Sequence, residues 1–138
     1  MFAEQEMLGQ ATVSIDQKKR IILPPFTYRE EGDTLILING YQENFVELMA
    51  YEKFCQLFQK IKDDKDIELL RKYYLADFSK RVVDAHYRIT LSTACLSILK
   101  EPTVFVKAIF DQVFLFSNQD EYSTHIQKTK SFESFPYR

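Results

Sequence analysis

Short apolar segments bounded by polar turns recur along the chain in an order that appears twice. An apolar segment at 11–15 is followed by Asp16, three residues, Arg20 and a second apolar segment. The same order returns after residue 79, where Asp84 and Arg88 stand 68 positions beyond Asp16 and Arg20. Segments rich in β-branched and aromatic residues between turn formers are typical of strands. The pattern therefore predicts two copies of a strand–turn–strand unit.

The correspondence continues downstream of each arginine. A helical turn is predicted after each second strand, followed by two further strands separated by a turn region. The matching ranges are 25–30 with 93–99, 34–38 with 103–107, 39–44 with 108–112, and 45–49 with 113–117. A copy of about 45 residues is too small to bury a good core alone. We therefore expect the copies to pack on each other about an internal pseudo-two-fold axis, with interleaved hairpins.

The hydrophobic period changes between the two copies. Apolar residues recur there at spacings of three and four, which places them on one face of a helix. They are Tyr51, Phe54, Phe58 and Ile61.

An acidic cluster follows this predicted helix. Its aspartates are interleaved with two lysines, a composition that favours a solvated turn between helices over a metal site; they are Asp63, Asp64 and Asp66. Asp66 is also a candidate N-cap for a second helix. One face of that helix would carry Ile67, Leu70 and Tyr74.

These patterns predict an α+β fold that is mainly β. The first repeat is expected at 10–53, a helical linker at 54–78 and the second repeat at 79–123. A short helix is expected at 121–130, and the patternless end at 131–138 is expected to fray.

Composition narrows the class of protein. The chain has 138 residues, of which 46% are hydrophobic and 28% charged, as in one globular domain rather than a disordered or disulfide-stapled chain. The formal net charge is −2, so any binding of nucleic acid has to come from a local basic patch. The N-terminal residues lack the apolar core of a secretory signal, and no apolar stretch approaches the ~20 residues of a membrane span. Cys55 and Cys95, far apart in apolar surroundings, are predicted to be reduced core thiols of a cytoplasmic protein.

Residues suited to catalysis are sparse. The three glycines are isolated and form no phosphate-binding loop, and His86 and His125 have no second histidine at the spacing of a metal site. A nucleophilic Cys95 activated by His86 would need a lowered thiol pKa, whereas its apolar neighbours predict burial. The sequence therefore favours a protein that is not an enzyme and needs no cofactor or metal.

Basic residues gather on the first predicted turn. Lys18, Lys19 and Arg20 form the only run of three basic residues in the chain. A protruding β-turn can enter the major groove of DNA, where arginine binds guanine through two atoms and lysine neutralises phosphates. The alternative is an ordinary solvated hairpin turn. We expect Arg20 to contact bases and the two lysines to contact phosphates.

The second turn carries a weaker version of this pattern. Arg88 is the counterpart of Arg20, and Lys80 with Arg81 is a candidate for phosphate contacts or an ordinary exposed strand end. Asp16 and Asp84 are expected to shape the two turns, because an aspartate at a turn start accepts hydrogen bonds from the backbone beyond it.

The repeated Asp-x-x-x-Arg followed by an apolar strand, with Pro24 closing the first copy, resembles the MraZ proteins of the AbrB/SpoVT swapped-hairpin superfamily. The likeness covers roughly residues 8–126 and is strongest at 16–24; residues 40–48 and 76–78 also resemble the family. It implies two tandem AbrB-like repeats that form a pseudo-two-fold, double-ψ-like barrel.

The resemblance also implies a function. Family members are cytoplasmic, nucleoid-associated regulators that repress their own cell-division and cell-wall gene cluster. They bind direct repeats of double-stranded promoter DNA as rings, here expected to contain roughly eight or more subunits. The arginine that the family uses for DNA corresponds to Arg20 and, by the repeat, to Arg88.

The chain departs from the family at the turns. Family turns usually carry glycine just before the arginine, where Lys19 and Tyr87 stand here. Such residues are expected to strain a left-handed turn or to force a different one. Ser92 also stands where the family often has proline. Two alternatives follow: a scaffold protein of the same fold that has lost specific DNA binding, or an antitoxin-like partner of another protein.

Overall fold

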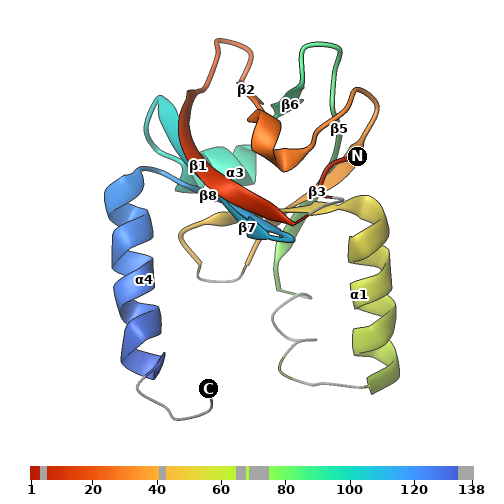
Figure 1. Ribbon diagram of the computed structural model, residues 1–138, viewed down its shortest axis with the longest axis vertical. Helices are drawn as coiled ribbons and strands as arrows, with labels where there is room; N and C mark the ends of the chain where they lie inside the picture. Colours follow the sequence, from red (N-terminus) through yellow and green to blue (C-terminus); the bar gives the residue numbers. More distant parts are fainter. Residues whose placement is uncertain (4–5, 41–42, 65–67, 69–74, 134–138) are drawn as a thin grey trace.

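Strands and helices in the described part of the chain form a mainly β structure with peripheral helices (Figure 1). The computed structural model describes residues 1–3, 6–40, 43–64, 68 and 75–133. The strands are β1 (Met7–Ser14), β2 (Arg20–Ile22), β3 (Thr34–Asn39), β4 (Val46–Ala50), β5 (Asp77–Val82), β6 (Arg88–Thr90), β7 (Thr103–Phe110) and β8 (Gln112–Phe116). The helices are the 3₁₀ turn η1 (Pro25–Thr27), α1 (Tyr51–Asp64), α3 (Thr93–Ile98) and α4 (Gln119–Glu133).

Six of these strands form one antiparallel sheet in the order β1-β7-β8-β4-β3-β5, and β2 pairs with β6 in a separate ribbon. The outer strands cross between the halves of the chain. Ser14 of β1 lies opposite Thr103 of β7, and Val82 of β5 lies opposite Thr34 of β3. The first strand of each half therefore pairs with the third strand of the other half. In the described residues β1 and β5 do not pair with each other, so the double-ψ-like barrel stays a prediction.

The register confirms one part of the expected match between the halves and corrects another. Equivalent residues of the two halves stand 68 positions apart only as far as the second strand of each half, β2 and β6. Thr34 and Thr103 are the partners of equivalent residues and stand 69 positions apart, as the match of 34–38 with 103–107 predicts. Leu48 and Leu115 are in turn the hairpin partners of Leu37 and Val106, and they stand 67 apart, whereas the match of 45–49 with 113–117 predicts 68. The turn expected at 108–112 is also shorter, because β7 runs to Phe110 and β8 begins at Gln112.

The main core lies between the sheet and the β2–β6 ribbon. Ile21 and Ile89, which lie opposite each other in the ribbon, are each 1% exposed and pack with Leu37, Leu48 and Leu115 of the sheet. A second cluster lies under α1 and contains Ile36, Ile38, Met49 and Ile61, with Phe54 and Phe58 packed against it. Strand β3 is buried on both faces because its alternate residues enter different clusters: Leu37 belongs to the main core, and Ile36 and Ile38 belong to the second cluster.

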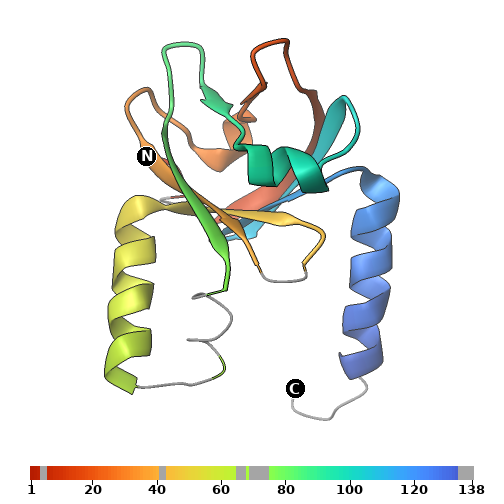
Figure 2. The same cartoon turned by 180° about the vertical axis from the view of Figure 1, so that it is seen from behind.

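Helices α1 and α4 extend from the side of the sheet opposite the ribbon (Figure 1 and Figure 2). The apolar face expected for the first of them is found for Phe54, Phe58 and Ile61, which pack on the sheet, whereas Tyr51 is 36% exposed and lies outside this cluster. Asp63 lies within α1, so the solvated turn expected at the acidic cluster does not begin there. Its carboxylate is exposed on the helix, just as it would be in a turn.

The remaining predictions for the helical segments have mixed outcomes. Asp66, Ile67, Leu70 and Tyr74 lie outside the described residues. Helix α4 begins at Gln119 and ends at Glu133, so it is longer than the expected 121–130, and the first three residues of the expected frayed end are helical.

The two thiols occupy different environments. Both are free, but Cys55 is exposed and only Cys95 is buried. The prediction of a core thiol is wrong for Cys55, which lies beside the packed residue Phe54 but on the solvent face of α1. Burial raises the pKa of the Cys95 thiol, as an inert core position requires. No described helix combines the length and apolarity needed to cross a bilayer.

Candidate functional site

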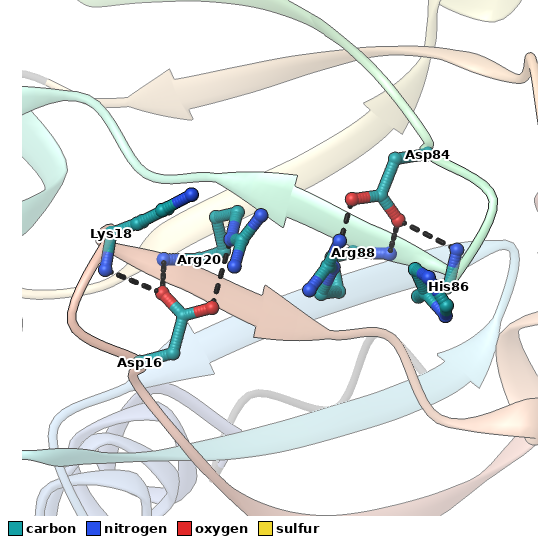
Figure 3. A network of polar contacts seen from close by, with 6 residues as sticks. All are labelled: Asp16, Lys18, Arg20, Asp84, His86 and Arg88. Carbon is teal, nitrogen blue, oxygen red and sulfur yellow. Dashed lines mark hydrogen bonds and ion pairs between the residues drawn. The ribbon is translucent and has the colours of Figure 1, made fainter.

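The turn between β1 and β2, residues 15–19, is organised by Asp16 and is called the first turn below. The Oδ1 atom of Asp16 accepts hydrogen bonds from the backbone nitrogens of Lys18 and Arg20, both at 2.9 Å (Figure 3). Its Oδ2 atom accepts one from Arg20 Nε at 2.8 Å. These contacts, first among them the one from the Arg20 backbone, lower the pKa of Asp16. The carboxylate is therefore charged near neutral pH and fixes both the turn and the arginine.

The turn between β5 and β6, residues 83–87, has the same geometry and is called the second turn. Asp84 Oδ1 accepts from the backbone nitrogens of His86 at 2.9 Å and Arg88 at 2.8 Å, and Oδ2 accepts from Arg88 Nε at 2.8 Å (Figure 3). Partial burial opposes ionisation of Asp84, but the hydrogen bonds from Arg88 and His86 outweigh it and the pKa is lowered. The two aspartates thus make the same contacts 68 residues apart.

Both turns keep a left-handed residue just before the arginine. Lys19 has φ of 64° and Tyr87 has φ of 62°. The turns close through a hydrogen bond from Lys19 N to Asp16 O at 3.0 Å, and through the equivalent bond from Tyr87 N to Asp84 O at 3.0 Å. Of the two expected outcomes, the left-handed turn is the one observed, and a residue with a Cβ is expected to cost on the order of 1–3 kcal/mol in this conformation.

The β2–β6 ribbon joins the two turns directly. Leu91 N donates to Lys19 O, and Leu23 N donates to Tyr87 O, each at 2.8 Å. The left-handed residue of each turn is therefore bonded to a residue of the other half. Both turns project from the same side of the molecule (Figure 1 and Figure 2).

The cations of the turns fall into two groups. Arg20 and Arg88 form ion pairs with their aspartates, and their side chains are 23% and 25% exposed. They lie on the outer face of the ribbon, since their neighbours Ile21 and Ile89 point into the core. Lys18 and Lys19 are exposed and have no carboxylate partner among the described residues.

Lys80 and Arg81 are engaged elsewhere. Arg81 Nε donates to Thr90 O at 2.9 Å and its Nη1 donates to Lys80 O at 3.0 Å, so this side chain ties β5 to β6. Lys80 Nζ lies 4.2 Å from the ring centroid of Tyr51, the first residue of α1. Lys18 and Lys19 therefore lie in the first turn, and Arg20 and Arg88 directly follow the two turns. Lys80 instead lies against the first residue of α1.

One cation at the second turn was not found from the sequence. Arg29 Nε donates to Leu23 O at 2.8 Å, and its guanidinium carbon lies 4.0 Å from the ring centroid of Tyr87. Arg29 stands alone beside two glutamates in the sequence, and no local pattern connects it with Tyr87, 58 residues away.

A shallow apolar hollow adjoins the arginines. Its volume is about 610 Å³, and Arg20, Arg88 and Asp16 line one part of it. The rest is mainly apolar and includes Ala11, Val13, Ile22, Leu23, Pro24 and Pro25. Charged hydrogen-bond donors thus stand next to an exposed apolar surface.

The described residues contain no group of three or more His, Cys, Asp or Glu side chains placed to hold a metal ion. No protein-family model matches the chain, and no curated protein matches its sequence.

Proposed function

We propose that this chain is a sequence-specific regulator that binds double-stranded DNA, built from two swapped-hairpin repeats of the AbrB/SpoVT type. In this proposal it acts as an MraZ-like repressor of its own division and cell-wall gene cluster and associates with the nucleoid. The observation that carries the proposal is the pair of turns with identical Asp–Arg geometry on one side of the molecule (Figure 3). The exchanged pairing of β1 with β7 and of β5 with β3 supports the swapped-hairpin interpretation.

The bound arginines suit base contacts. Asp16 holds Nε of Arg20 and thereby fixes the guanidinium, whose two Nη atoms have no partner among the described residues and remain as a pair of donors. Such a pair matches the O6 and N7 acceptors of guanine in the major groove. Because Asp16 cancels the charge of Arg20, this contact would supply specificity more than electrostatic attraction. The apolar hollow beside it is suited to a thymine methyl group.

Lys18 and Lys19 suit phosphate contacts. Their charges are not cancelled by a described carboxylate, and both side chains are exposed. Phosphate contacts give affinity and register without reading sequence.

Assembly would compensate for the small number of cations. The net charge of one chain is −2, so a single copy should bind DNA weakly. Strands β1 and β5 form the two edges of the sheet, and unpaired edges favour association with further copies. A ring would present several pairs of turns to adjacent promoter repeats at high effective concentration.

The test is a binding titration with a fluorescein-labelled duplex from the promoter of the chain's own gene, with a shuffled duplex beside it. Arg20→Ala should weaken binding to the promoter duplex about 5- to 150-fold, the range of one bidentate base contact, and should reduce the preference over the shuffled duplex. Lys60→Ala removes an exposed cation from α1 and is the matched control. Equal affinities of the wild type and Arg20→Ala would refute the assigned role.

The main alternative is a scaffold or antitoxin-like protein of the same fold. The neutralised charges of Arg20 and Arg88 favour it, because each turn loses a cation to its aspartate. A salt series separates the two functions. Affinity for duplex that falls steeply with salt supports DNA binding, and absence of binding at low salt supports the alternative.

A further inference from the structure

The two turns differ in the cations they carry. The first turn has Lys18 and Lys19, whereas His86 and Tyr87 occupy the corresponding positions of the second turn. Within residues 83–88 Arg88 is the one lysine or arginine, and it is paired with Asp84. The second turn therefore lacks an uncompensated cation of its own.

Arg29, from the other half of the chain, lies at this position. Its guanidinium carbon is 4.0 Å from the ring centroid of Tyr87, and its Nε atom donates to Leu23 O at 2.8 Å. Leu23 N in turn donates to Tyr87 O at 2.8 Å. Leu23 is thus held on both sides, and Arg29 is fixed to the second turn through the ring and through this backbone.

The residue immediately before Arg29 has an unusual backbone conformation. Tyr28 has φ of 54° and ends η1 in the left-handed conformation, with its nitrogen donating to Pro25 O. This left-handed residue ends the helical turn and is followed directly by Arg29.

The charge of Arg29 is not cancelled within the described residues. Arg20 and Arg88 have aspartate partners, but no described carboxylate pairs with Arg29. Nε and one face of the guanidinium are occupied, while the Nη atoms have no described partner. Tyr87 is 39% exposed, so the stacked pair is at the surface.

Among the described residues, no arginine from the second half stacks on a ring of the first turn in the same way. The positions of the second half that correspond to Arg29 by sequence offset are Ser97 and Ile98, neither of which is charged. Ser97 Oγ donates to Ala94 O within α3. The first turn carries its own lysines, and the second turn receives its cation from the opposite half.

We propose that Arg29 is the phosphate-contacting cation of the second turn, held in place by the ring of Tyr87. The stacked ring fixes the guanidinium, and its Nη atoms donate to one phosphate of the DNA backbone. This inference rests on the proposed DNA-binding function and adds to it a residue and a role.

The test measures how affinity for a fluorescein-labelled duplex depends on salt. Each phosphate contact contributes about 0.9 to the slope of log affinity against log salt concentration. Arg29→Gln can still donate to Leu23 O but carries no charge, so its slope should be shallower by about one and its low-salt affinity lower. Arg29→Lys should restore the slope, and Ser97→Ala should leave it at the wild-type value.

A second substitution examines the ring. Tyr87→Phe keeps the stacking face and should retain the wild-type slope, whereas Tyr87→Leu should lower it as Arg29→Gln does. Thermal unfolding of each variant, followed by circular dichroism, verifies that the chain is folded at the titration temperature.

The outcomes distinguish this inference from the proposed function. A wild type that binds duplex, with Arg29→Gln showing the same slope and affinity, overturns the role of Arg29 and leaves the function standing. A wild type that binds no duplex at low salt overturns both. A slope lowered in Arg29→Gln and restored in Arg29→Lys supports the inference, since a purely structural loss would not follow the charge.

Discussion

Ile21 lies directly opposite Ile89 at the centre of the β2–β6 ribbon, and each side chain is 1% exposed. This contact places one residue from each half between the two turns. It therefore fixes the relative position of the turns as well as filling the core.

Replacement of Ile21 by alanine should reduce the free energy of unfolding by about 2–5 kcal/mol, the usual cost of a large-to-small change in a packed core. Ile22→Ala is the matched control, because this neighbouring side chain is 54% exposed and its loss should cost well under 1 kcal/mol. Urea denaturation followed by circular dichroism measures both. Equal losses in the two variants would contradict the assignment of Ile21 to the core.

The close approach of Gly9 and Phe26 gives a second prediction. A Cβ atom added at Gly9 would lie 2.6 Å from Cγ of the Phe26 ring, so Gly9→Ala should destabilise the fold by about 1–3 kcal/mol through overpacking. The measurement is the urea midpoint. In the background Phe26→Ala, the same glycine substitution should cost much less, and an undiminished cost would show that the ring is not the cause.

The left-handed residue of the first turn gives a third. Lys19→Gly removes the Cβ from a position with φ of 64° and should leave stability unchanged or raise it by up to about 1 kcal/mol, as relief of strain exceeds the added entropy of the unfolded chain. Lys18→Gly, at a neighbouring residue without positive φ, should only lose stability. Thermal melts of the two variants compare them, and a larger loss for Lys19→Gly would exclude strain at this position.

The aspartates of the turns predict an acid-dependent stability. Their pKa values lie below the ordinary 3.8 in the folded protein, so folding favours the charged carboxylates. The stability they contribute is present above the unfolded pKa and is lost as the pH falls through the lower folded pKa. Asp16→Asn combined with Asp84→Asn should therefore lower stability at neutral pH and make its fall below about pH 4 shallower.

Urea midpoints measured from neutral to acidic pH test this prediction. Asp63→Asn is the control, because Asp63 is exposed on α1 and belongs to neither turn. If the difference between the wild type and the double variant stays constant down to pH 2, the two carboxylates do not account for the acid response.

The turns and the strands were accessible from the sequence because both have local causes. The spacing of Asp16 and Arg20 places a carboxylate within reach of the backbone and the guanidinium across one turn, and its recurrence at Asp84 predicts a second such turn. The expected strands are present at 34–38 and 103–107 within β3 and β7. The α+β, mainly β class follows from the same segments.

Long-range contacts and exact register were not accessible. Arg29 contacts Tyr87 because the two halves exchange strands. A hydrophobic pattern along the chain cannot predict a contact between residues 58 positions apart. The offset of 67 between Leu48 and Leu115 depends on the lengths of the hairpin connections, which the pattern of apolar residues does not fix. The prediction for Cys55 was wrong because a helix that packs on one face leaves the neighbour of a packed residue, here Phe54, in solvent.

The exchange of hydrogen bonds between the turns and the opposite strands has a consequence for any attempt to divide the molecule. Lys19 O is satisfied by Leu91, and Tyr87 O by Leu23, so a fragment cut between the halves would leave its turn open until it met a complementary fragment. Neither half is therefore expected to complete its turn without the other half. Because the two halves belong to one chain, each half always has the other available for pairing. The sequence of one turn can therefore change while the other turn keeps the β2–β6 ribbon in place.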